Sequence, residues 1–327
     1  MDLFAPNSSY SPMKPPIFVG GDRTLAYSII ITVSTIGLTL ECLFLAGIRR
    51  LCGFEANYAF TLLAGIALCG VHHILVESTA ATLAIIGSQW ENNILLFRIL
   101  GELAFAPLFC LPYFHILLAA HRVLVVAFPL SCKALHRPVI WKTALVLILV
   151  FYISFLVINL TSLAGISYVP RHMIFISLYL PYTYIFFDLN DFANYGILAI
   201  SITVYPTLLI YLKFTSKMSG SRSRYEAKMT IQVIIMVAIE ICFFVAWVVV
   251  PLRGPVGVLV KDLSNLFYSV AIIMPYLIWN KAVHEEIKLL FRKPWASPPT
   301  PTSALAPHYI DKKARITPLV SSVPLST

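Results

Sequence analysis

Seven mostly apolar stretches, each about as long as a membrane-crossing helix, run through this 327-residue chain. A helix needs about 20 apolar residues to cross roughly 30 Å of hydrocarbon. The stretches are Thr24–Ile48, Ala56–Ile86, Ile94–Ala120, Val139–Gly165, Phe192–Leu212, Met229–Leu252 and Leu263–Asn280. A further stretch, Met173–Phe187, is shorter and holds Pro181, which predicts an apolar outer loop near the lipid headgroups. The chain is therefore expected to be an all-α membrane protein, a bundle of seven transmembrane helices.

The composition excludes a water-soluble fold. Apolar residues make up 59% of the chain and charged residues 12%, whereas a typical soluble domain has about 25% charged residues. The net charge of +9 does not indicate a nucleic-acid partner, because Lys and Arg are concentrated between the apolar stretches and in the C-terminal tail. We therefore expect membrane lipids, and no nucleic acid, among the partners.

The distribution of basic residues predicts the orientation in the membrane. Most of the 24 Lys and Arg residues fall on one side if the N-terminus is outside, and the basic side of a membrane protein faces the cytoplasm. We expect a multi-pass protein of the plasma membrane with its N-terminus outside and its C-terminus in the cytoplasm. No cleavable signal peptide is expected before the first span. Asn7 stands in an Asn-Ser-Ser sequon and is a predicted glycosylation site.

This topology divides the chain into three segments. Residues 1–23 are an extracellular tail, residues 24–291 are the transmembrane domain, and residues 292–327, rich in Pro, Ser and Thr, predict a disordered cytoplasmic tail. The end of the transmembrane domain, Lys281–Phe291, places its apolar residues on one helical face. This pattern predicts a short amphipathic helix along the inner membrane surface.

Two motifs at the predicted inner ends of the spans resemble those of a known family. Arg122 ends the third span and is followed seven residues later by a Pro-Leu pair, and the seventh span holds Pro275 before it ends at Asn280. This spacing resembles that of the rhodopsin-like G-protein-coupled receptors. The resemblance implies that residues 24–291 form a receptor domain. It also implies that His121, Arg122, Pro275 and Asn280 belong to the part that couples to a G protein.

The chain departs from the family pattern at several positions. His121 and Val123 flank the arginine in place of an acidic and an aromatic residue, and Met274 replaces the asparagine of the proline motif. Ala67 stands where the family has a sodium-binding aspartate, and the common cysteine pair of the outer side is missing. This combination resembles the nematode serpentine chemoreceptors, a divergent rhodopsin-like group, which implies a role in sensory perception.

An arginine at the membrane edge needs a partner, because an ionised guanidinium in the membrane is costly. His121 cannot supply a permanent carboxylate, and Glu226 at the inner end of the sixth span is the nearest candidate. We hypothesise that an Arg122–Glu226 tether holds the resting state. The alternative is that Arg122 extends to the lipid phosphates.

Four carboxylates lie within the predicted spans: Glu41, Glu77, Glu102 and Glu240. Burial of such groups is costly unless they are paired or protonated, which makes each a functional candidate. Arg98 stands one helical turn from Glu102, at a spacing where side chains meet. We predict that Glu77, Arg98 and Glu102 contact a ligand in a polar pocket open to the outside, with structural pairing between helices as the alternative. Glu41 and Glu240 lie deeper and are expected to form interhelical hydrogen bonds.

Trp247 and Tyr268 are the candidate aromatic residues of the same pocket, with plain helix packing as the alternative for each. A pocket with glutamates and one arginine suits cations, small polar molecules or amphiphiles. The apolar outer loop also suits lipids.

Catalysis is not expected. His72 and His73 are adjacent and point in different directions on a helix, so they do not form the ligand cluster of a membrane zinc enzyme, and no metal site is predicted. An aspartyl protease needs two membrane aspartates, whereas every Asp is expected in a loop or a tail. An opsin needs a lysine in the middle of the seventh span, which this stretch does not have. No cofactor is predicted.

The expected function is that of a G-protein-coupled chemoreceptor. Such a protein transmits the binding of an extracellular small molecule or peptide to a heterotrimeric G protein. A proton-coupled membrane transporter is the alternative, because four membrane carboxylates could form a proton relay. Against it, the seven spans show no internal repeat of the kind that transporters favour.

Overall fold

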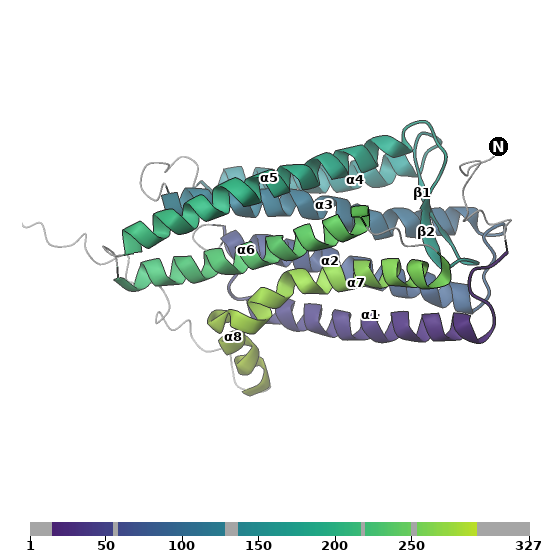
Figure 1. The fold of residues 1–327 in the computed structure, drawn as a ribbon, viewed down its shortest axis with the longest axis horizontal. Helices are drawn as coiled ribbons and strands as arrows, with labels where there is room; N and C mark the ends of the chain where they lie inside the picture. Colours follow the sequence, from purple (N-terminus) through teal and green to yellow (C-terminus); the bar gives the residue numbers. More distant parts are fainter. Residues whose placement is uncertain (1–14, 55–57, 128–136, 217–219, 250–253, 293–327) are drawn as a thin grey trace, which may run out of the picture. The chain divides into compact units, whose positions relative to one another are not determined.

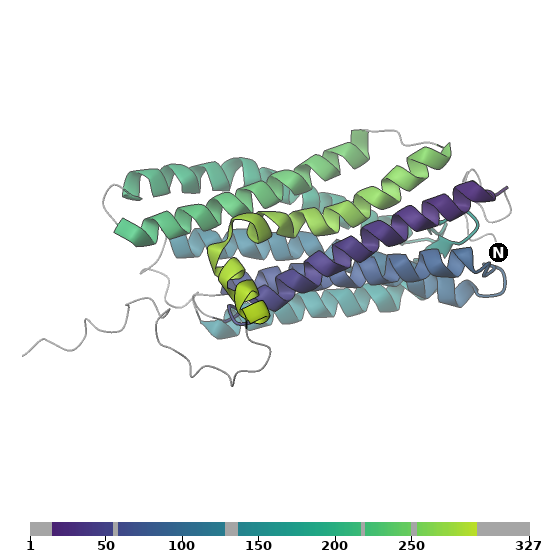
Figure 2. The same ribbon diagram turned by 90° about the horizontal axis from the view of Figure 1, so that it is seen from below.

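The computed structural model describes residues 15–54, 58–127, 137–216, 220–249 and 254–292. Most of these residues belong to long helices that lie side by side (Figures 1 and 2). The helices are α1 (Gly21–Ile48), α2 (Tyr58–Ile85), α3 (Ile94–Ala127), α4 (Pro138–Asn159), α5 (Thr183–Ser216), α6 (Gly220–Val249), α7 (Gly254–Trp279) and the short α8 (Lys281–Arg292). The prediction of a seven-helix membrane bundle followed by a short helix is confirmed.

Six of the described helices are long and apolar enough to cross a membrane: α1 to α4, α6 and α7. The remaining long helix, α5, contains the predicted Phe192–Leu212 stretch but has Asp188, Asn190, Asp191 and Asn194 in its first turns. Contacts along the chain divide it into residues 1–290 and 291–327, and the first unit holds the whole bundle.

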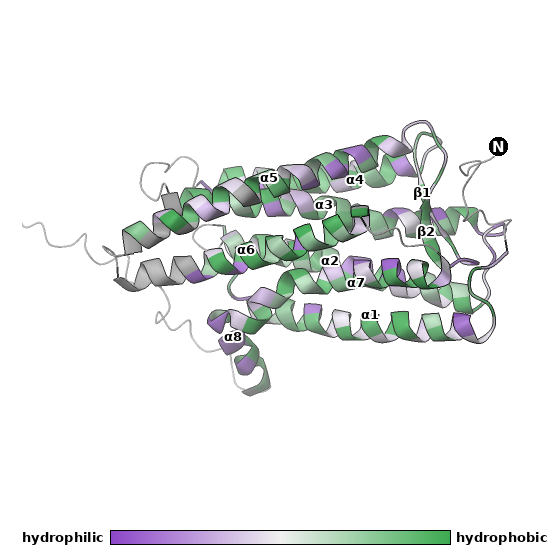
Figure 3. Cartoon of the chain, in the orientation of Figure 1, coloured by the Kyte–Doolittle hydropathy of each residue, from purple (hydrophilic) through white to green (hydrophobic). Residues whose placement is uncertain are grey.

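The outward faces of the helices are largely apolar. In Figure 3 the colour of hydrophobic residues recurs along every long helix. Many apolar side chains are exposed, among them Val146, Leu147 and Val150 of α4. A soluble protein rarely exposes apolar patches of this extent. Contact with lipid explains them, because the hydrocarbon of a bilayer does not penalise apolar surface.

Several helix ends differ from the predicted spans, among them those of α4 and α7. α4 ends at Asn159 rather than Gly165, and α7 begins at Gly254 rather than Leu263. The earlier start places Asp262 inside α7, where it is 4% exposed. The expectation that every Asp lies in a loop or a tail is therefore wrong. Asp262 interrupts the apolar sequence pattern near the N-terminal end of α7, but the helix continues through it.

A β-hairpin lies between α4 and α5, at the end of the bundle opposite α8 (Figure 1). Its strands, β1 (Ile166–Val169) and β2 (Ile174–Ser177), pair antiparallel, and β1 is buried throughout. β1 lies against α3 at Gly101, where a Cβ atom would be 2.5 Å from the carbonyl oxygen of Ile166. Only glycine permits so close an approach. The segment predicted as an outer loop, Met173–Phe187, contains β2 and the start of α5.

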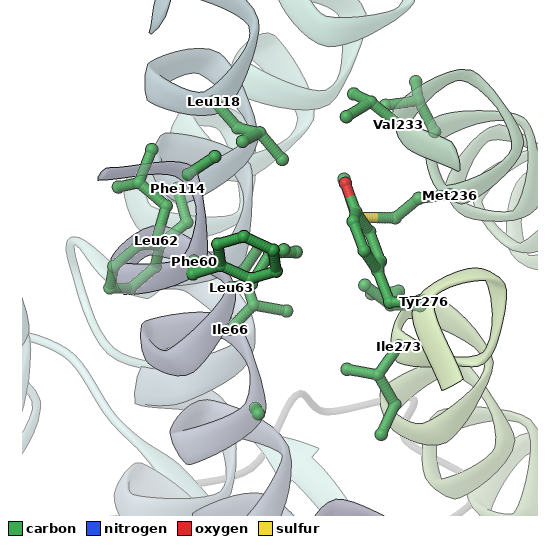
Figure 4. Close-up of a cluster of buried hydrophobic side chains, with 14 of the residues drawn as sticks. Phe60, Leu62, Leu63, Ile66, Phe114, Leu118, Val233, Met236, Ile273 and Tyr276 are labelled. Carbon is green, nitrogen blue, oxygen red and sulfur yellow. The ribbon is translucent and has the colours of Figure 1, made fainter. Parts of the chain in front are cut away.

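The largest buried cluster joins α2, α3, α6 and α7. Tyr276 of α7 lies beside Met236 and Val233 of α6 and opposite Phe60 and Leu63 of α2 (Figure 4). All five side chains are buried. Close packing of this kind drives helix association in a bilayer, where lipid and side chains are equally apolar. Tyr268 belongs to this cluster and also lines the candidate site described below.

Candidate functional site

A cavity of about 430 Å³ lies between strand β2 and helices α3, α5, α6 and α7. Its volume is within the range of roughly 300–1,000 Å³ that is usual for small-molecule sites. Most of the lining is aromatic or aliphatic, and its polar members are Ser177, Asn190, Asn194, Lys261 and Asn265. The predicted pocket residues Trp247 and Tyr268 both line it.

Four phenylalanines form one wall of the cavity. The ring of Phe105 lies 5.9 Å from that of Phe109 and 6.0 Å from that of Phe175, and the rings of Phe109 and Phe187 are 5.5 Å apart. All three pairs meet edge to face, which is a favourable geometry for aromatic rings. The wall joins α3, β2 and α5 into one apolar surface.

Trp247 is fixed to α7 by hydrogen bonds. Its indole N–H donates to the hydroxyl of Ser264 at 2.7 Å, and this hydroxyl donates to the backbone carbonyl of Lys261 at 2.6 Å. The Trp247 and Tyr268 rings also meet edge to face, with centroids 5.1 Å apart. Trp247, Tyr268 and the backbone of Lys261, the residue that supplies the cation of the cavity, therefore form one connected unit.

This unit continues into the centre of the bundle. The hydroxyl of Tyr268 donates to Glu240 Oε1 of α6 at 3.3 Å, and Glu240 Oε2 lies 2.5 Å from Nδ1 of His115 on α3. The side chains of His115 and Glu240 are 0% and 3% exposed. The expected interhelical contact of Glu240 is present, and it links the cavity to the α3–α6 pair.

The structure places Glu102 and Arg98 away from the cavity lining, where they hold the hairpin and the end of α4. Glu102 is fully buried, and its Oε1 accepts a hydrogen bond from the backbone N–H of Ile166 at 2.6 Å. Arg98 donates to the backbone carbonyls of Asn159 and Thr161, each at 2.7 Å. These contacts correspond to the structural alternative, with the backbone as partner, and a ligand contact of either residue stays a prediction.

Glu77 also lies outside the lining, in a buried polar group beneath the hairpin. Burial raises the pKa of the Tyr168 hydroxyl on β1 well above its usual value, and the nearby carboxyl groups of Glu77 and Asp262 raise it further. The guanidinium of Arg23 acts on Tyr168 in the opposite direction. Arg23 also donates to the backbone carbonyls of Ala84 and, at 3.4 Å, of the hairpin turn. The group therefore joins α1, α2, α7 and the hairpin.

His121 and Arg122 are both buried near the C-terminal end of α3. The ring of His121 lies 5.5 Å from that of Tyr58 and 5.3 Å from that of Trp141. The Tyr58 hydroxyl in turn donates to the backbone carbonyl of Trp141 at 3.1 Å. His121 thus packs α3 against α2 and α4.

Asn280 connects α6 to α8. Its Oδ1 accepts hydrogen bonds from the backbone N–H groups of Ala282 at 3.1 Å and Val283 at 3.3 Å, so the side chain caps the first turn of α8. Its Nδ2 donates to Gln232 Oε1 of α6 at 3.2 Å. A movement of α6 away from α7 breaks this second contact.

The remaining predicted residues differ in what the structure describes. Pro275 is buried inside α7, where it removes one helical hydrogen bond. Glu226 lies in the first turns of α6, but its side chain is outside the described part, as is Asn7. The Arg122–Glu226 tether and the glycosylation of Asn7 stay predictions.

The sequence reasoning missed the most polar part of the cavity. Lys261 and Asn265 were not expected, because they precede or begin the predicted seventh span. Their spacing of four residues, with Tyr268 three further on, places all three on one helical face. Once α7 is extended to Gly254, this periodicity identifies the cavity-facing side of the helix.

The arrangement of the helices defines a multi-pass membrane protein with the rhodopsin-like seven-helix fold. It resembles the crystal structure of squid rhodopsin with a TM-score of 0.65, and the match covers 85% of this chain and 91% of that chain. The sequence identity is 12%, so the likeness shows the fold alone. No model of a known protein family and no curated protein matches the sequence.

Proposed function

We propose that this chain is a G-protein-coupled chemoreceptor of the plasma membrane, similar to the nematode serpentine receptors. Its N-terminus is outside and its C-terminus is in the cytoplasm. It transmits the binding of an extracellular ligand to a heterotrimeric G protein. The observation that carries the proposal is the chain of contacts from the cavity through Trp247, Tyr268 and Glu240 to His115.

The contacts suggest how binding is transmitted. A ligand shifts a conformational equilibrium only if it interacts differently with the two states. A ligand that displaces the Tyr268 ring changes the hydrogen bond to Glu240, and Glu240 of α6 in turn contacts His115 of α3. At the inner end, outward movement of α6 separates Gln232 from Asn280. The two contacts together couple the cavity to the surface around Arg122.

The inner surface supplies the site for the G protein. The C-terminal end of α3, which holds Arg122, the N-terminal end of α6, and α8 all lie at the end opposite the hairpin (Figure 1). We assign Arg122 to the contact with the G protein and retain the Arg122–Glu226 tether as the resting-state contact. If Glu226→Ala leaves ligand-free signalling unchanged, the tether is wrong.

The transmission route is tested by removal of one hydroxyl group. A ligand is first found by a screen with a G-protein readout, and the Tyr268→Phe variant is then compared with the wild type. We expect it to keep ligand binding and lose most of the signalling, because Phe keeps the ring but not the hydrogen bond to Glu240. Tyr195→Phe on α5, whose side chain is exposed, is the matched control. Equal signalling by the two variants would contradict the route.

Glu41 is the observation that favours the transporter alternative. It is fully buried, and neither carboxylate oxygen has a hydrogen-bond partner among the described residues. The prediction that a protonated Glu41 forms an interhelical hydrogen bond is therefore wrong. A proton-carrying carboxyl group in a transporter has this character. A receptor predicts that guanine-nucleotide analogues alter ligand affinity. A transporter predicts uptake that such analogues do not affect and that Glu41→Gln abolishes.

A further inference from the structure

We propose that the cavity binds an amphiphilic anion, whose acidic group pairs with Lys261 and whose apolar body lies against the phenylalanine wall. The inference rests on the proposed function for its physiological meaning and names the ligand class of the same site. It replaces the expectation that glutamates make the pocket suitable for cations.

The charge of the lining is the first observation. Lys261 is the charged residue among those that line the cavity in the described part of the chain, and no carboxylate joins them. Lys261 is exposed, and the described residues include no carboxylate within ion-pair distance of its ammonium group. The glutamates expected in the pocket are held elsewhere, Glu102 by the backbone of β1 and Glu77 in the polar group around Tyr168. Among the described residues, the cavity lining thus offers one cationic side chain and no carboxylate, and the carboxyl group of the neighbouring Asp262 is buried.

Hydrogen-bonding groups lie beside this cation. Asn265 stands one helical turn below Lys261 on the cavity-facing side of α7, and Asn190 and Asn194 repeat the same spacing on α5. Side-chain amides donate hydrogen bonds to acidic oxygens. An acidic group beside α7 therefore finds the ammonium group of Lys261 and the amide donor of Asn265 on one helical face, and Asn190 and Asn194 add amide donors elsewhere in the lining.

The rest of the lining selects an apolar body. Phe105, Phe109, Phe175 and Phe187 form the wall, and Trp247 and Tyr268 lie on the α6–α7 side. A volume of about 430 Å³ holds roughly 14 non-hydrogen atoms, if each takes the ~30 Å³ that a water molecule occupies in the liquid. Naphthaleneacetate has this size and an aromatic skeleton that fits edge-to-face contact. It is a suitable probe of the class.

Binding of three probes with the same ring system to the purified full chain in lipid nanodiscs tests the charge preference. The probes are naphthaleneacetate, its neutral amide and naphthylethylamine, and the readout is isothermal titration. We expect the acid to bind about tenfold or more tightly than the amide, and the amine to bind most weakly, because a charge-assisted hydrogen bond is about twice as strong as a neutral one. Equal or tighter binding of the amine, or no binding of the acid at about 1 mM, overturns the proposal.

Variants of Lys261 assign the preference to this residue. Lys261→Ala should weaken acid binding about tenfold and leave amide binding unchanged, and Lys261→Arg should restore the acid preference. Arg171→Ala removes an exposed positive charge from the hairpin turn, outside the lining, and serves as the control for long-range charge effects. An equal loss in Arg171→Ala and Lys261→Ala overturns the assignment. Ligand-free melting temperatures equal to the wild type show that each variant is folded.

Binding and signalling separate this inference from the proposed function. If the acid binds through Lys261 but no G protein responds to any ligand, the ligand class stands and the receptor function fails. If other compounds elicit a G-protein response that Lys261→Ala does not alter, the receptor function stands and the anionic ligand class fails.

Discussion

The buried contact between His115 of α3 and Glu240 of α6 makes a quantitative prediction about stability. Both side chains are almost inaccessible, and His115 Nδ1 lies 2.5 Å from Glu240 Oε2. Removal of one partner from a buried pair leaves the other without compensation and costs about 3–5 kcal/mol. In Glu240→Leu the Tyr268 hydroxyl also loses its acceptor, which adds about 1 kcal/mol. We therefore expect the variant to lose at least about 3 kcal/mol of stability.

A double-mutant cycle separates the pair from other effects. His115→Phe and Glu240→Leu each leave a buried polar partner, whereas the double variant replaces both with apolar side chains of similar size. The double variant should therefore be more stable than the sum of the single losses predicts, by about 2 kcal/mol. Independent sites agree within about 0.5 kcal/mol, so the expected difference is measurable.

Thermal unfolding of the purified full chain in detergent is the assay. One kcal/mol corresponds to about 2–4 °C for chains of 150–250 residues, so Glu240→Leu should melt about 6–12 °C below the wild type. His72→Phe is the control, because the contact of His72 with the Tyr152 hydroxyl is only partly buried and 3.4 Å long. Additive losses in the cycle, or a loss no larger than that of His72→Phe, would refute the reasoning.

Three further predictions concern the two ends of the bundle. Asn280→Ala removes the cap of α8 and should speed hydrogen exchange in its first turn by the equivalent of about 1 kcal/mol; unchanged protection would contradict this. Gly101→Ala inserts a Cβ atom 2.5 Å from the Ile166 carbonyl oxygen and should lower the melting temperature by the equivalent of about 1–3 kcal/mol, whereas a wild-type melting temperature would mean that the hairpin moves freely. Burial raises the pKa of the Cys52 thiol, so the fraction of reactive thiolate at a given pH is lowered. The experiment uses a Cys132→Ser variant, because Cys132 lies outside the described residues and its thiol could also react. Labelling of Cys52 by a maleimide should need a higher pH than labelling of a free thiol. A membrane-impermeant maleimide should react with Cys52 only after the cells are permeabilised.

The helices could be predicted from the sequence because apolar length is a local property. A bilayer requires each crossing segment to satisfy its own backbone hydrogen bonds, so hydropathy alone identifies the spans. The ends of the helices depend on other parts of the chain. α7 begins at Gly254, before the predicted start at Leu263, because Asp262 is accommodated next to Glu77 and Tyr168. Those two residues are far away in the sequence. The hairpin was missed for the same reason, since β1 lies against Gly101 of α3.

The candidate site was predicted in part. Trp247 and Tyr268, the predicted aromatic residues of the pocket, both line the cavity, and a ligand contact of either residue stays a prediction. The polar residues were harder to assign, because a sequence shows that a carboxylate lies in a span but not what satisfies it. Glu102 accepts a backbone hydrogen bond from β1, and no periodicity within α3 reveals that partner.

The glutamates of the bundle and the lysine of the cavity have different surroundings. This difference explains why we propose an anionic ligand, whereas the glutamates in the sequence suggested cations. A carboxylate inside a bundle must be paired, and the structure satisfies Glu102 and Glu240 with protein groups that fix the hairpin and the α3–α6 contact. Among the described residues of the cavity lining, the charged side chain is that of Lys261. It is exposed, because an ammonium group on a long flexible stem reaches water near the N-terminal end of α7. We therefore expect the exposed ammonium group of Lys261 to set the charge selectivity of the cavity. The buried carboxylates determine how the bundle responds once a ligand is bound.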